Sequence, residues 1–87
     1  MTQNERDILQ SIICDRNSII VLYEKNKTDI AHPVTPEEKE KYRRRLYRYE
    51  EEIQQYIDSV NVTPAEEETY IYSRYGLFAD IEKIMEG

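Results

Sequence analysis

Residues 42–60, with the sequence YRRRLYRYEEEIQQYIDSV, decide how this chain folds. Apolar and aromatic residues recur in this stretch at intervals of four, three, four, three and four positions: Tyr42, Leu46, Tyr49, Ile53, Tyr56 and Val60. This is the spacing of the a and d positions of a heptad repeat, with aliphatic residues at a and tyrosines at d. The pattern predicts a long helix that packs one narrow stripe of side chains against other helices.

Two similar start signals set the boundaries of this helix and of the next one. Thr35 is followed by proline and two glutamates, and Thr63 is followed by proline, alanine and three glutamates. Threonine caps the free N–H groups, proline suits the first helical position, and carboxylates favour the positive end of a helix. These signals predict helices over about 36–59 and about 64–86.

An earlier helix is predicted over about 3–26, because Thr2 and Glu5 have capping-box spacing and the apolar residues between 8 and 23 share one side of a helical wheel. Gly76 lies inside the last predicted helix. A glycine costs roughly 1 kcal/mol in a helix interior, so this helix can kink or break there.

These elements together predict the fold class. Long helices joined by short loops fold back antiparallel. We therefore expect an all-α single domain over residues 1–87, an antiparallel three-helix bundle with the helix over 36–59 at its centre. A chain of this length has a thin core, and such chains often gain stability by oligomerisation. The narrow stripe could therefore also serve in a dimer.

The composition excludes several kinds of chemistry. With one cysteine, Cys14, and one histidine, His32, the chain can form neither an internal disulfide nor a zinc site. No Gly-rich phosphate loop, Ser-His-Asp set or EF-hand spacing is present. We expect no catalytic residue, no cofactor and no metal. The polar N-terminus and the short apolar runs predict a cytoplasmic protein without a membrane span.

The net charge of −6 bears on the choice of partner. An acidic balance argues against general binding of nucleic acid, which depends on neutralising phosphates. The arginine–tyrosine stretch at 43–49 resembles a nucleic-acid patch locally, but three glutamates follow it directly. The charge is better suited to a protein partner with a basic surface.

The charges beside the stripe suggest self-association. Arginines at 43–45 are followed one heptad later by glutamates at 50–52. Two copies of the helix, paired antiparallel and crossing near Tyr47, would place each basic block opposite an acidic block. The predicted self-association residues are Tyr42, Arg43, Arg45, Leu46, Tyr49, Glu50, Glu52, Ile53 and Tyr56. The simpler interpretation is a solvated helix face of mixed charge.

Tyrosines away from the packing stripes are candidates for contact with another protein, because tyrosine is enriched in interfaces. Scattered surface tyrosines also occur without any such role. Together with nearby charged side chains, the predicted partner interface is Tyr47, Arg44, Glu51, Glu66, Glu67, Glu68, Tyr72 and Tyr75.

Two arginines fall within apolar faces, Arg16 on the first helix and Arg74 on the last. A buried guanidinium requires a partner, and Asp15, Glu24 and Glu67 are the candidates. The functional alternative is that the two arginines line an anion pocket or a catalytic groove.

Three hypotheses of function follow. The first is a small acidic, non-enzymatic interaction protein, such as an inhibitor, an immunity factor or a regulatory subunit, that occludes a basic partner surface; small acidic proteins of phages and mobile elements offer an analogy by class. The second is a homo-oligomeric adaptor or scaffold that assembles through the helix over 36–59. The third is a small helical enzyme or anion-binding protein that uses Arg16 and Arg74.

Overall fold

The structure, a computed structural model, describes residues 1–66 and 74–86. The first helix, α1, spans Gln3–Lys27. Its start is a reciprocal capping box: the Thr2 hydroxyl accepts a hydrogen bond from the Glu5 N–H, and the Glu5 carboxylate accepts one from the Thr2 N–H. Both N–H groups would otherwise lack a partner, so this local pattern determines where α1 begins.

The second helix, α2, spans Pro36–Val60 and begins in a similar way. Thr35 accepts a hydrogen bond from the Glu38 N–H, and Pro36 occupies the first turn. The helix ends at Asn61, whose backbone is left-handed with φ of 52°. Asparagine tolerates this conformation better than most residues, so it serves as a stop signal.

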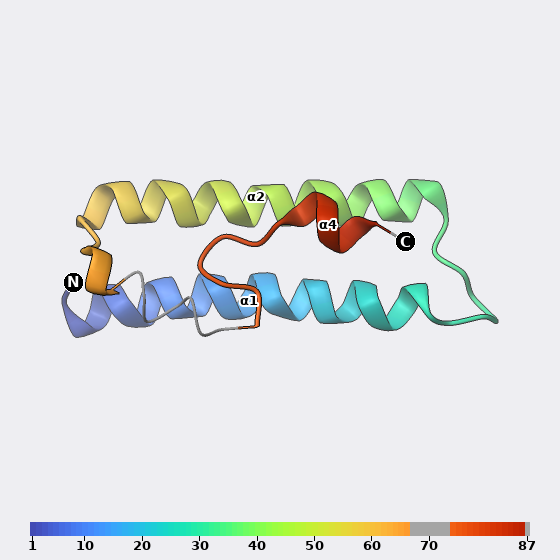
Figure 1. Cartoon of the computed structure of the whole chain (residues 1–87), viewed down its shortest axis with the longest axis horizontal. Helices are drawn as coiled ribbons and strands as arrows, with labels where there is room; N and C mark the ends of the chain where they lie inside the picture. The colour runs from blue at the N-terminus through green and yellow to red at the C-terminus, as the bar shows by residue number, and fades with distance from the viewer. Residues whose placement is uncertain (67–73, 87) are drawn as a thin grey trace.

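The two long helices lie antiparallel and side by side along a molecule that measures 46 × 21 × 20 Å (Figure 1). One apolar cluster between them contains Leu9, Ile13, Ile53, Ile57 and Leu77. A second cluster contains Ile20, Tyr23, Leu46, Ile81 and Met85. Leu46 and Ile53, two a positions of the heptad stripe, have no exposed surface. These a positions of the stripe therefore lie in the seam by which α2 packs against α1.

The rest of the chain differs from the predicted third helix. Residues 64–66 are helical, and Thr63 and Glu66 exchange the hydrogen bonds of another capping box. Residues 67–73 lie outside the described part of the chain, residues 74–80 are not helical, and a short helix, α4, spans Ile81–Met85. A continuous helix over 64–86 is therefore not found at residues 74–80, and the alternative of a break at Gly76 is found.

Gly76 lies in this break with φ of 71°, a left-handed conformation that glycine adopts without strain. Asp80 then starts α4 by accepting a hydrogen bond from the Lys83 N–H. In the described residues the fold consists of two long helices with short helical pieces and no strand, and a three-helix bundle is not confirmed. No helix in this part of the chain is long and apolar enough to cross a membrane.

Candidate functional site

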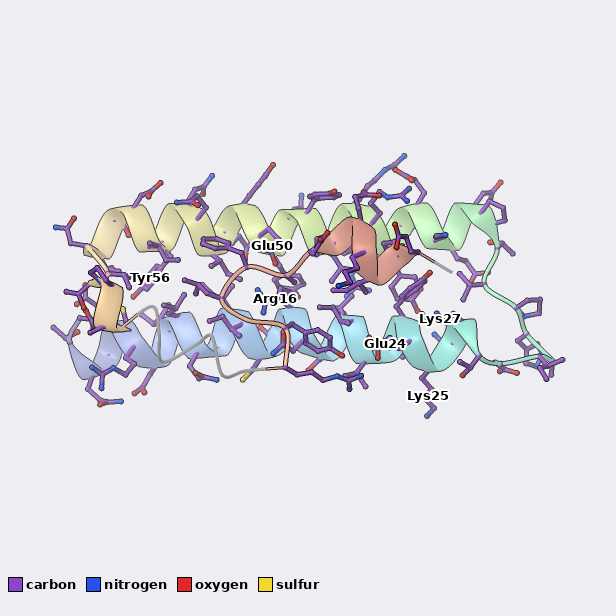
Figure 2. The ribbon with its side chains drawn as sticks, in the orientation of Figure 1. Arg16, Glu24, Lys25, Lys27, Glu50 and Tyr56 are labelled. Atoms are coloured by element: carbon purple, nitrogen blue, oxygen red, sulfur yellow. The ribbon has the colours of Figure 1, made fainter. Side chains whose placement is uncertain are left out.

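A buried arginine connects α1, α2 and the C-terminal segment, which we define as residues 74–86. The Arg16 side chain has no exposed surface. Its Nη1 donates to Glu50 Oε1 at 3.1 Å and to the Leu77 carbonyl at 2.5 Å, and its Nη2 donates to the Gly76 carbonyl at 2.6 Å. Asn17 Oδ1 accepts from Nε and Nη2. We call this set of bonds the Arg16 clamp; Figure 2 shows Arg16 and Glu50 facing each other between the long helices.

The electrostatics of the clamp indicate a positioning role. Burial lowers the pKa of Arg16, and the attraction of Glu50 offsets this only in part. Burial likewise raises the pKa of Glu50, against the opposing effects of Arg16 and of the Ala79 N–H, which donates to Glu50 at 3.2 Å. Both shifts disfavour the charged forms, so the pair itself costs free energy. The clamp holds residues 76–79 in a defined position against the hairpin formed by α1 and α2.

Arg74 lies in a different environment from Arg16. Its side chain is 70% exposed and its Nη2 lies 3.2 Å from Glu24 Oε2, while the Tyr75 hydroxyl donates to Glu24 Oε1 at 3.2 Å. An open cavity of about 400 Å³ is lined by Arg74 together with Glu24, Lys27 and Lys83 among others, but Arg16 does not line it. The predicted pairing of an arginine with Glu24 is thus found for Arg74, whereas Arg16 pairs with Glu50, which was not among the predicted partners.

A second group of contacts holds the C-terminal segment to α2. The Tyr47 hydroxyl donates to Glu82 Oε1 at 2.8 Å, and this hydrogen bond is the main reason why the pKa of Tyr47 is raised. Arg43 Nε donates to the same oxygen at 3.1 Å and its Nη1 donates to Glu40 at 2.7 Å. Tyr47, predicted for a partner, and Arg43, predicted for self-association, are therefore both engaged within the chain.

The C-terminal segment contacts one side of the hairpin, through Arg16 and Glu24 on α1 and through Arg43, Tyr47 and Glu50 on α2. Glu66 reaches the same side, because its partner Arg6 lies 18 residues, or about five helical turns, before Glu24. Successive residues in a helix are rotated by about 100°. The tyrosines of the stripe therefore lie on the opposite side of α2 from Tyr47.

We call this opposite side the open face. Its apolar and aromatic residues come from both long helices and are Ile8, Ile12, Ile19, Leu22, Tyr42, Tyr49 and Tyr56. Ile8 and Leu22 expose 41% and 42% of their surface, and the others are half-buried. Charged residues of both helices line an open cavity of about 430 Å³ at the edge of this face: Asp15, Arg45, Arg48 and Glu52, beside Tyr49.

The fold also concentrates negative charge at one end of the molecule. Figure 1 places the N-terminal half of α1 beside the C-terminal half of α2. Among the described residues 1–15 and 51–66, which we call the acidic end, Arg6 is the one basic side chain. The acidic side chains there are Glu5, Asp7, Asp15, Glu51, Glu52, Asp58 and Glu66. Each long helix has an acidic half and a half with more basic than acidic side chains, and the antiparallel hairpin places the two acidic halves side by side.

Glu66 is the one acidic group at this end with a strongly shifted pKa among those described. It accepts hydrogen bonds from the Met1 ammonium group at 2.9 Å and from the Thr63 N–H at 3.3 Å, and Arg6 lies 3.6 Å away. The ammonium hydrogen bond is the largest cause that lowers the pKa of Glu66 to about 2. Glu66, predicted for a partner, is therefore paired within the chain.

The predicted partner interface does not form one patch. Arg44, Tyr47 and Glu51 are exposed on α2, whereas Tyr75 is half-buried and bound to Glu24. Glu67, Glu68 and Tyr72 lie outside the described residues. The predicted self-association set divides in three: Leu46 and Ile53 are buried, Arg43 and Glu50 bind the C-terminal segment or Arg16, and Tyr42, Arg45, Tyr49, Glu52 and Tyr56 lie on or beside the open face.

Comparison with known proteins found no match to this chain among protein-family models, curated proteins or solved structures. In the described residues, no group of three or more His, Cys, Asp and Glu side chains could hold a metal ion, and Cys14 is exposed. A hypothesis of function is therefore based on the charge distribution and the exposed surfaces of the described residues.

Proposed function

We propose that this protein is a non-enzymatic protein–protein interaction module that binds a basic surface of its partner with its acidic end and occludes that surface, as an inhibitor, immunity factor or regulatory subunit does. The observation that carries the proposal is the separation of charge along the hairpin. The acidic end has seven acidic side chains and one basic side chain, Arg6. The other described residues hold eleven basic and nine acidic side chains.

The length of the molecule makes this separation effective. The longest dimension is 46 Å, whereas exposed charges are screened over about 8–10 Å at physiological ionic strength. The acidic end therefore presents its own field, which the basic residues at the far end do not cancel. Such a field attracts a basic surface and speeds its association.

Several carboxylates of the acidic end are not paired with a basic group of the described chain. Glu66 is held by the Met1 ammonium group and Arg6. Asp7 and Asp58 are exposed and accept only from glutamine side chains one turn away, and Glu51 is exposed as well. None of these three carboxylates forms an ion pair with another described residue.

A homo-oligomeric adaptor or scaffold is the second candidate, and one observation favours it: isoleucine, leucine and tyrosine side chains of both long helices are left partly exposed on the open face. The third hypothesis, an anion site built from Arg16 and Arg74, gains no support, because Arg16 is buried against carbonyl groups and Arg74 is exposed elsewhere.

The test is quantitative capture from a lysate of the cells that make the protein, followed by mass spectrometry. The variant Asp7→Lys/Asp58→Lys reverses charge at the acidic end, and Glu37→Lys/Glu86→Lys makes the same change in charge at the other end. We expect the wild type and the second variant to retain one stoichiometric partner with a basic surface. Recovery should fall on the order of tenfold with the first variant, and also when salt is raised from about 0.05 to 0.3 M. Equal recovery by both variants would refute the proposal.

A further inference from the structure

We infer that the open face binds a second copy of this chain, in an antiparallel two-fold dimer in which Arg45 of each copy pairs with Glu52 of the other. This goes beyond the proposed function, which uses the acidic end. The inference joins three observations: the partly exposed apolar residues of both helices, the position of Arg45 and Glu52 at the edge of the same face, and the separation of charge along the molecule.

The apolar residues give the face its driving force. Ile8 and Leu22 are over 40% exposed, and half-buried Ile12, Ile19 and the stripe tyrosines lie between them. A stable interface buries roughly 800 Å² on each partner, and a face of a molecule measuring 46 × 21 Å is large enough for this. The thin core of a small chain increases the gain from such burial.

The symmetry of the charges selects a second copy as the occupant. Arg45 and Glu52 are seven residues, or about two helical turns, apart and point to the same side of α2. Neither forms an ion pair with another described residue of its own chain. A two-fold axis in the plane of the open face, perpendicular to the helices and midway between these two residues, places each Arg45 opposite the other copy's Glu52.

The same axis also matches the ends of the two molecules. It lays the acidic end of each copy across the half of the other copy that carries Lys41, Arg45 and Arg48. A parallel arrangement would place acidic end on acidic end and would be repelled. Tyr49, which lies close to the axis, would meet the other copy near the centre, where aromatic residues contribute most to an interface.

This dimer differs from one built on the whole heptad stripe. Leu46 and Ile53 remain in the seam with α1, and Arg43 and Glu50 remain bound within their own chain. Of the charged residues at 43–45 and 50–52, only Arg45 and Glu52 lie on the open face, where they can contact the second copy.

Sedimentation equilibrium of the purified chain tests the inference without any other partner. We expect a mass of twice 10.5 kDa at the upper end of a range from about 1 to 200 µM, with dissociation on dilution. Arg45→Glu and Glu52→Arg each place like charges opposite one another at both symmetric contacts, so each should raise the dimer dissociation constant on the order of tenfold. The double variant Arg45→Glu/Glu52→Arg restores opposite charges and should return the constant to the wild-type range.

The matched controls are Arg44→Glu and Glu51→Arg, which have the same spacing and charge change but lie on the outer face of α2. We expect each to leave the constant within about threefold of the wild type. A wild-type monomer at the highest concentration would overturn the inference. So would equal weakening by the control variants, or a double variant as weak as the single ones. Sedimentation uses the purified chain alone, whereas capture uses a lysate and the variants Asp7→Lys/Asp58→Lys and Glu37→Lys/Glu86→Lys, so the two proposals can fail separately.

Discussion

Arg16 Nη1 lies 3.1 Å from Glu50 Oε1, and this buried contact separates the two apolar clusters of the core. The two residues face each other at only one register of the antiparallel helices, because a shift of one position would rotate each side chain by about 100°. The same guanidinium binds the carbonyl groups of Gly76 and Leu77. One side chain therefore sets both the pairing of the long helices and the position of the C-terminal segment.

Replacing Arg16 should be among the most damaging single changes. Arg16→Met leaves the Glu50 carboxylate and two carbonyl groups without their donor, and breaking a buried pair in this way costs about 3–5 kcal/mol. The free energy of unfolding from urea denaturation measures the loss. Arg74→Met, which removes an exposed pair with Glu24, is the matched control and should cost less than about 1 kcal/mol.

The double variant Arg16→Met/Glu50→Met separates the two parts of this cost. Removing the buried carboxylate together with the guanidinium should recover part of the lost stability, since burial disfavours both charges. The unmet carbonyl groups remain, so recovery should be incomplete. A double variant that is less stable than Arg16→Met alone would contradict this description of the clamp.

Replacing Gly76 should lower the stability because of its left-handed backbone conformation and not because of steric crowding. At φ of 71° a Cβ atom would lie 3.7 Å from the Phe78 carbonyl oxygen, an ordinary contact. The expected cost of Gly76→Ala is therefore the left-handed strain of about 1–2 kcal/mol, measured by urea denaturation. Gly76→Asn should cost less, because asparagine tolerates this conformation. Equal losses for both variants would point to a steric cause.

Glu66 predicts how stability depends on acid. The folded-state pKa of about 2 lies below the ordinary 4.5, so the folded chain favours the ionised carboxylate. Its contribution to stability is complete above the ordinary value and is lost as the pH falls from about 5 toward 2. Glu66→Gln should therefore lower the melting temperature at pH 7 and flatten its decline in acid. Glu51→Gln, an exposed change at the same end, should alter neither; a Glu66→Gln variant with an unchanged acid profile would contradict the assignment.

Leu46 and Leu22 test the two sides of the helix pair. Leu46 has no exposed surface, so Leu46→Ala should cost about 2–5 kcal/mol through lost burial and the cavity it leaves. Leu22 is 42% exposed, and Leu22→Ala should cost less than about 1 kcal/mol when unfolding is measured at a protein concentration near 1 µM. Similar losses for the two variants would mean that the stripe is not the main packing seam.

The two long helices could be predicted from the sequence because their signals are local. Thr2 and Thr35 each cap a helix within three residues, and the heptad stripe specifies the buried side of α2 without reference to any other element. Gly76 is a local signal for a possible break, but the extent of the break over 74–80 could not be predicted in this way. It depends on hydrogen bonds that Arg16, about 60 residues earlier, donates to carbonyl groups that a continuous helix would have used internally.

The candidate sites depend still more on distant contacts. The heptad position of Glu50 groups it with Arg43, but the antiparallel register of α1 places it against Arg16 instead. Tyr47 stands off the stripe as the wheel predicts, yet its hydroxyl is bound by Glu82, 35 residues away. The pattern of one helix identifies which residues lie off its seam; it does not determine which of them the rest of the chain will contact.

Both core clusters include side chains from the last part of the chain: Leu77 completes one, and Ile81 and Met85 complete the other. During synthesis α1 and α2 leave the ribosome before residues 76 and 77. Arg16 cannot yet donate hydrogen bonds to the Gly76 and Leu77 carbonyl groups at that stage. A hairpin that lacks these last side chains has an incompletely closed apolar seam, and such a state is exposed to aggregation and to binding by chaperones. Native packing can be completed only after residue 85 has left the exit tunnel.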